Sequence, residues 1–63
     1  MNTIAERIRF AMNVRNVKQV EMVQRTGITK GAFSSYLSGN YNPKNDKLEL
    51  IADALDININ WLM

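Results

Sequence analysis

Residues 19–36, QVEMVQRTGITKGAFSSY, decide the fold of this 63-residue chain. Apolar side chains recur at helical spacing on both sides of a short break. Gly27 ends the first run, because glycine takes the left-handed conformation without steric cost, and Thr29 is placed to cap the second. The stretch therefore predicts two helices, 19–26 and 30–38, joined by only three residues. The side chains expected to face the core are Met22, Val23, Thr26, Phe33, Tyr36 and Leu37.

A helix is predicted before this stretch. Thr3 and Glu6 stand three residues apart and form a capping box, so we expect a helix from there to about Val14. The start of the next helix is less clear, since Lys18 is a poor cap and Asn16 with Gln19 is a possible substitute. The core stripe of this helix is Ile4, Ile8, Ala11 and Met12.

Two further helices are predicted after it. Gly39 ends the helix over 30–38, and residues 40–45 form a loop by composition. Asp56 follows the fourth helix where a helix can end, and Asn58 caps a last turn over 59–63. The fourth helix turns Leu48, Ile51, Ala52 and Leu55 to the core. We expect an all-α domain over 1–63, a compact bundle of five short helices.

Composition excludes several classes of function. The chain has no cysteine and no histidine, which excludes disulfides, Cys/His zinc sites and Ser–His–Asp catalysis. No apolar run approaches the ~20 residues that a membrane span needs, and no signal peptide is recognised. We expect no enzyme, no cofactor, no metal, no small-molecule ligand and no membrane partner. The default location is the cytoplasm.

Charge is distributed unevenly. Residues 1–47 carry all 8 basic side chains and three acidic ones, a net charge of +5, while residues 48–63 carry three acidic side chains and none that is basic, a net charge of −3. A basic body with an acidic end suggests a polyanionic partner. The alternative is an ordinary solvated surface.

The short connection over 27–29 is typical of a helix-turn-helix, a motif whose second helix enters the DNA major groove. Residues 19–36 resemble that motif in the Cro/CI family of phage repressors and their bacterial relatives. The resemblance covers nearly the whole chain and implies a lambda repressor-like fold, with this chain as the N-terminal DNA-binding part of a longer repressor. It continues through Ser38, Gly39 and Pro43, resumes at Leu48, Ile51, Ala52, Ala54 and Leu55, and ends at Trp61, Leu62 and Met63.

The resemblance also implies site residues. The recognition helix would be 30–38, and the expected base contacts are Thr29, Lys30, Gly31, Ser34 and Ser35. The expected backbone contacts are Gln19, Lys18, Ser38, Asn40, Tyr41, Asn42 and Lys44. Lys30 is the best candidate for a guanine contact, and Thr29 and Ala32 for a thymine methyl. Arg15 and Lys47 are plausible additions to the phosphate set. Trp61 is expected to pack the last turn onto the bundle.

This sequence departs from the family at three positions. Lys18 replaces the usual Thr or Ser cap, and Val23 stands where an alanine is usual. Gly31 replaces a long polar side chain, so base specificity leans on DNA shape and on the loop.

The favoured function is a sequence-specific transcriptional repressor that binds a palindromic operator as a homodimer, in the nucleoid of a bacterial host cell. The alternative is a helical protein-interaction or antitoxin-like module that keeps the fold without operator binding. We expect the isolated domain to be largely monomeric, because no apolar surface is left over beyond the core. A protein partner would instead need an exposed patch at Met63, Ile59 and Tyr41.

Overall fold

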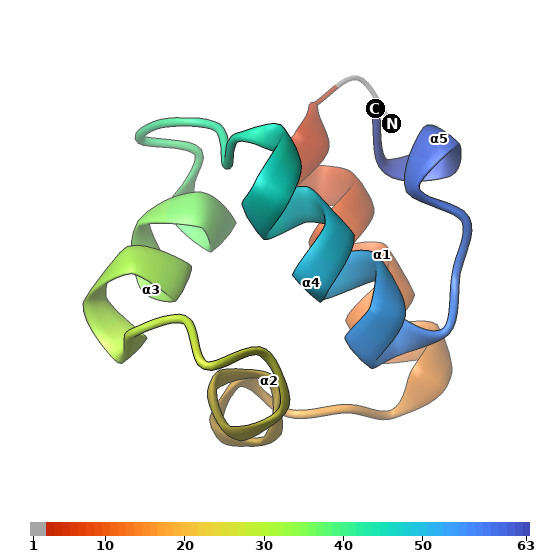
Figure 1. Ribbon diagram of the computed structural model, residues 1–63, viewed down its shortest axis with the longest axis horizontal. Coiled ribbons are helices and arrows are strands. Elements are labelled where there is room, and N and C mark those ends of the chain that lie inside the picture. The colour runs from red at the N-terminus through yellow and green to blue at the C-terminus, as the bar shows by residue number, and fades with distance from the viewer. Residues whose placement is uncertain (1–2) are drawn as a thin grey trace.

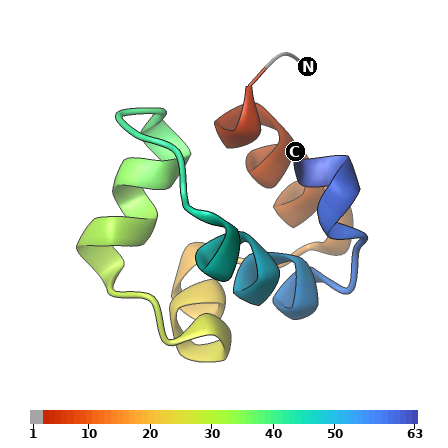
Figure 2. The same ribbon diagram turned by 45° about the horizontal axis from the view of Figure 1, so that its top comes forward.

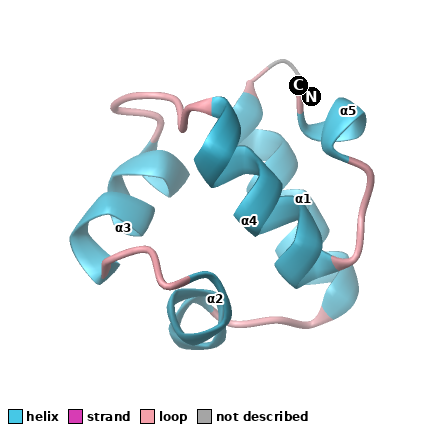
Figure 3. Ribbon diagram, in the orientation of Figure 1, coloured by secondary structure: helices cyan, strands magenta, loops and turns pink. Residues whose placement is uncertain are grey.

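The computed structural model describes residues 3–63, and over that range it contains five helices and no strand (Figures 1 and 3). This confirms the all-α prediction. None of these helices is long and apolar enough to cross a membrane. The helices are α1 (Ile4–Arg15), α2 (Gln19–Thr26), α3 (Lys30–Ser38), α4 (Asn45–Leu55) and α5 (Ile59–Leu62).

Three predicted side-chain caps, at Thr3, Thr29 and Asn58, are present. The Thr3 hydroxyl accepts from the Glu6 backbone N–H at 3.1 Å, and the Glu6 carboxylate accepts from the Thr3 N–H at 3.2 Å. Thr29 Oγ1 accepts from the Ala32 N–H at 3.2 Å at the start of α3. These side chains satisfy backbone donors that have no partner inside their helix, which fixes where each helix begins.

The start of α2 is capped differently from either proposed cap. Lys18 is the N-cap residue, and its backbone N–H donates to the Glu21 carboxylate at 3.2 Å, while its ammonium has no lone pair to accept a bond. Asn16 instead ends α1 in the left-handed conformation, at φ 56°. The suggestion that Asn16 caps α2 is therefore wrong, because that residue is committed to the preceding helix.

The core lies between the helices, and each of α1 to α5 contributes buried side chains to it (Figure 2). Helix α4 packs against α1, α2 and α5, and α3 packs against α1 and α2. The apolar stripes predicted from the sequence supply this core. Its fully buried members include Ile8, Met22, Phe33, Ile51, Leu55 and Leu62.

The turn between α2 and α3 has the predicted construction. Gly27 adopts φ 75°, and Ile28 is only 3% exposed, closing the corner between the two helices. The buried Thr26 hydroxyl donates to the Met22 carbonyl at 2.7 Å and accepts from the Ile28 N–H at 3.1 Å. The turn is therefore fixed from both sides, and the crossing of α2 and α3 with it.

The last turn meets the expectation for Trp61 only in part. Trp61 remains 42% exposed, while its neighbour Leu62 is fully buried and holds α5 to the bundle. A helix of four residues can turn only one side to the core, and Leu62 occupies it. The indole instead contacts the ring of Phe10, with 6.0 Å between ring centroids.

Candidate nucleic-acid interface

Helix α3 lies at the edge of the bundle, between α2 and the loop that follows α3. Helix α2 lies beside its N-terminal end, and the loop over 39–44 leads away from its C-terminal end (Figures 1 and 2). The expected base-contacting residues Thr29, Lys30, Gly31 and Ser34 are exposed, and Ser35 is half-buried. The predicted recognition surface is therefore open to solvent over residues 29–34.

The hydroxyl groups on this surface differ in whether they are already hydrogen-bonded within the chain. Thr29 Oγ1 already caps α3, and the Ser38 hydroxyl donates to the Ser35 carbonyl at 3.0 Å. Ser34 has no such bond within residues 3–63 and is exposed. Ser34 is consequently the hydroxyl best placed to bond an outside partner.

Three arginines are used to hold the fold. Arg9 donates to the Leu37 carbonyl near the end of α3, and Arg15 donates to the Asp56 carbonyl at 3.0 Å. Arg25 donates to the Ala54 carbonyl at 3.2 Å and pairs with Glu21 at 3.5 Å. Each guanidinium thus satisfies a carbonyl at a helix C-terminus, where the helix dipole also favours a cation. Arg15 points to the end of α4 and is not among the lysines around α3.

The lysine side chains, unlike those of these three arginines, do not bond to other parts of the described chain. Over residues 3–63, no hydrogen bond or ion pair engages the ammonium groups of Lys18, Lys30, Lys44 and Lys47. Lys18 and Lys30 stand at the N-termini of α2 and α3, while Lys44 is the N-cap of α4. A cation at a helix N-terminus opposes the helix dipole, so these lysines do not serve helix stability. They are free to meet an anion outside the chain.

The structure places one expected base contact and one expected backbone contact at the same hollow. Gln19 at the start of α2 and Lys30 at the start of α3 line one hollow of about 320 Å³, together with Val20 and Val23. The hollow lies between α2 and α3, which the short turn at Gly27 holds against each other. For brevity, the term lysine face denotes five of the expected DNA contacts on α2, α3 and the start of α4: Lys18, Gln19, Lys30, Ser34 and Lys44.

The expected backbone contacts in the loop are exposed. Asn40, Tyr41, Asn42 and Lys44 all face solvent, and the Tyr41 ring meets the Tyr36 ring edge-on, with 6.0 Å between centroids. Ser38 and Asn42 line a separate hollow of about 540 Å³ beside the start of α1. The predicted set is therefore distributed along α3 and the loop, and only Gln19 and Lys30 share a hollow.

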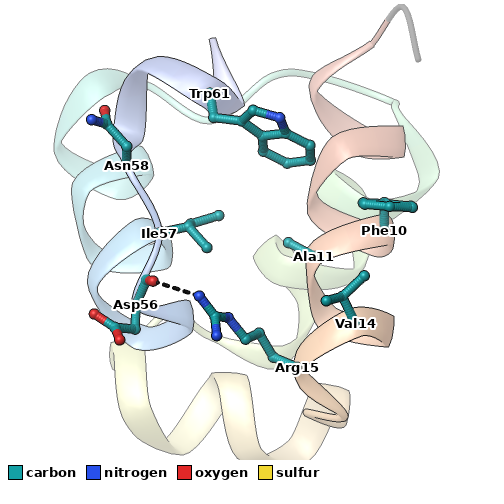
Figure 4. A pocket seen from close by; sticks show the side chains of 8 residues that line it. All are labelled: Phe10, Ala11, Val14, Arg15, Asp56, Ile57, Asn58 and Trp61. Atoms are coloured by element: carbon teal, nitrogen blue, oxygen red, sulfur yellow. Dashed lines mark hydrogen bonds between the residues drawn. The ribbon is translucent and has the colours of Figure 1, made fainter.

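The structure also has an exposed apolar surface that was not predicted from the sequence. Phe10 and Val14 of α1 are 47% and 63% exposed, and with Ile57 and Trp61 they line a hollow of about 450 Å³ (Figure 4). We call these four residues the aromatic hollow. The expectation that no apolar surface is left over is wrong, because Phe10 and Val14 lie one turn apart on a side of α1 away from its core stripe. That i, i+4 spacing was the available signal.

The patch expected for a protein partner is only partly present. Met63 and Tyr41 are 57% and 58% exposed, whereas Ile59 is partly buried against the core.

A sequence family described as "Helix-turn-helix domain" matches residues 5–63. The chain is 34% identical over 62 residues to the "HTH-type transcriptional regulator for conjugative element R391" of Providencia rettgeri and to the corresponding regulator for conjugative element SXT of Vibrio cholerae. Each match covers 98% of this chain and 28% of the relative, so the chain spans little more than a quarter of these proteins. No solved structure matches the chain.

Proposed function

Because this chain belongs to the helix-turn-helix family, in its Cro/CI-type branch, we propose that it binds double-stranded DNA and regulates transcription. The relatives it matches are regulators of transcription, and the family is not one of enzymes.

One observation carries the proposal. Exposed Lys30 and half-buried Gln19 line one hollow between α2 and α3, and the lysines around α3 have no intramolecular partners within residues 3–63. In a helix-turn-helix the N-terminal residues of the second helix reach base edges and the first helix meets the backbone. Lys30 would then read a base, and Gln19, Lys18 and Lys44 would hold phosphates.

We also propose the finer function. The chain acts as a repressor of the CI type, in the cytoplasm, as a homodimer on a palindromic operator. Two recognition helices would enter successive major grooves, about 34 Å apart. The relatives are regulators for conjugative elements, which supports a role at the promoter of a mobile element here.

The test is an amide chemical-shift titration of the labelled chain with a mixed-sequence duplex at low and moderate salt. We expect Gln19, residues 29–35 and residues 40–44 to shift together, and added salt to reverse the shifts, because counterions compete for the phosphates. A titration in which no amide shifts would overturn DNA binding.

A second function is favoured by the aromatic hollow. Exposed apolar side chains that contact one another are typical of a protein-binding surface. The alternative is therefore a protein-interaction or antitoxin-like module that uses α1 and α5. If the amide signals of α1 and α5 shift when a bacterial lysate fraction is added, and no amide signal shifts with duplex DNA, this alternative replaces the first.

A further inference from the structure

The exposed side of α3 carries few groups that can tell one base pair from another. Lys30 is its one long polar side chain, and it is joined by the short hydroxyl of Ser34. At Gly31 no heavy atom lies within 4 Å of where a Cβ would stand, so the helix presents an open, flat position. Hydrogen bonding from α3 alone therefore gives limited discrimination, while a base edge can approach the helix closely.

An apolar element stands beside this surface. The hollow between α2 and α3 is lined by Val20 and Val23 together with Gln19 and Lys30. Val23 packs partly against the core, but Val20 is 61% exposed. Valine is a moderate helix former at best, so an exposed valine does not help α2 to form.

We propose that this hollow receives the C5-methyl group of a thymine, so that Val20 and Val23 set part of the base preference. The inference rests on the proposed DNA binding and names what that same site recognises. The thymine methyl is the one apolar group that the major groove presents, and small apolar side chains are its usual partners in proteins.

Charge and continuity favour this occupant over an apolar protein segment. Lys30 lines the hollow, Lys18 directly precedes Gln19 in the chain, and neither ammonium is engaged within the described part of the chain. Gln19 and Lys30 belong both to the hollow and to the proposed DNA contacts. If Lys30 reads a base while Lys18 and Gln19 hold a phosphate, the neighbouring base would lie with its edge against the two valines.

The size of the effect follows from the chemistry. Moving one methyl group from water to an apolar surface changes an affinity by about fourfold. The hollow, at about 320 Å³, has room for a methyl group and the base edge that carries it. A single thymine in each half-site should therefore show a dependence of this order.

The experiment begins with a duplex that the chain itself selects from a randomised pool. Each thymidine is then replaced in turn by deoxyuridine, which removes only the methyl group and keeps the base pair. We expect one thymidine in each half-site at which deoxyuridine weakens binding by about fourfold.

The variant is Val20→Ala, and the matched control is Val14→Ala, since Val14 is an exposed valine of α1 in the aromatic hollow. We expect the deoxyuridine penalty to become smaller in Val20→Ala, which removes two of the methyl groups that line the hollow, and to stay unchanged in Val14→Ala. Val23→Ala should reduce it too, and its fold is checked by thermal unfolding.

Each other outcome overturns the inference. If no thymidine shows a penalty, or if the penalty is equal in Val20→Ala and Val14→Ala, the valines do not read a methyl group, yet DNA binding stands. If the chain selects no duplex and binds none, the proposed function fails as well. If Val20→Ala weakens every duplex equally, the hollow contacts the sugar-phosphate backbone instead.

Discussion

Positively charged side chains have different roles at the two ends of the bundle. Those of the lysine face are unpaired in the described part of the chain, whereas the arginine beside the aromatic hollow is bonded within the chain. Around α3, lysines stand at helix N-termini, where the dipole disfavours them, and none is paired within residues 3–63. At the other end, Arg15 bonds the Asp56 carbonyl beside Phe10 and Trp61 (Figure 4). Arg9, Arg15 and Arg25 therefore stabilise helix ends, and the lysines remain available to a partner. Net charge alone would not have separated the two.

The most direct way to break this comparison is a pair of charge reversals. Lys30→Glu should weaken binding to a mixed-sequence duplex by about a hundredfold, since a good base contact contributes about 1–3 kcal/mol and the new carboxylate is repelled by phosphates. Arg15→Glu changes the net charge equally but should weaken binding by about fivefold or less, because salt screens distant charges. Fluorescence anisotropy measures both. Equal losses would mean that only net charge matters.

A second pair tests what holds the lysine face in place. Gly27 has φ 75°, so Gly27→Ala should lower the unfolding free energy by about 1–2 kcal/mol, the cost of a left-handed residue with a side chain. Gly31 is helical and has open space at its Cβ position, so Gly31→Ala should raise the unfolding free energy by about 1 kcal/mol. Thermal unfolding followed by circular dichroism checks both. Shifts of the same sign would refute the role given to the turn.

A third prediction concerns the arginines. Arg25→Ala removes the bond to the Ala54 carbonyl and should lower the unfolding free energy by about 1 kcal/mol. The exposed ion pair with Glu21 adds little to this. DNA affinity should stay within about twofold of the original, because this guanidinium serves the fold. Urea unfolding and anisotropy are measured together, and an affinity loss without a stability loss would contradict the assignment.

The smallest expected effect is at Lys44. Replacing this loop lysine with alanine should weaken all duplexes alike by a few-fold and reduce the slope of log affinity against log salt by about 0.9, the value of one phosphate contact. Its unfolding temperature should not move, since no bond to the chain is lost among the described residues. An unchanged slope would remove Lys44 from the interface.

Features that depend on residues close together in the sequence were predicted more accurately than contacts between residues far apart in the sequence. The bounds of α2 and α3, the caps at Thr3, Thr29 and Asn58, and the left-handed ends at Gly27 and Asp56 were predicted as found. All depend on residues within four positions of one another. Lys18 was the exception, since the cap of α2 is a backbone N–H bonded by Glu21.

The aromatic hollow could not be predicted in the same way. Phe10 and Trp61 stand 51 positions apart in the sequence, and their contact depends on how α5 docks against α1. The same holds for Arg15, whose partner carbonyl at Asp56 is 41 positions away. By charge alone, this arginine was grouped with the lysines.

The sequence by itself therefore determined the helices, their ends, the core stripes and the family, because capping, glycine conformation and helical periodicity act over short separations. Only the tertiary structure decided which cations hold the fold and which stay available, and which apolar side chains remain exposed. Those outcomes depend on contacts between helices distant in the chain, which a one-dimensional pattern does not specify. The meeting of Val20, Val23 and Lys30 in one hollow is of this kind.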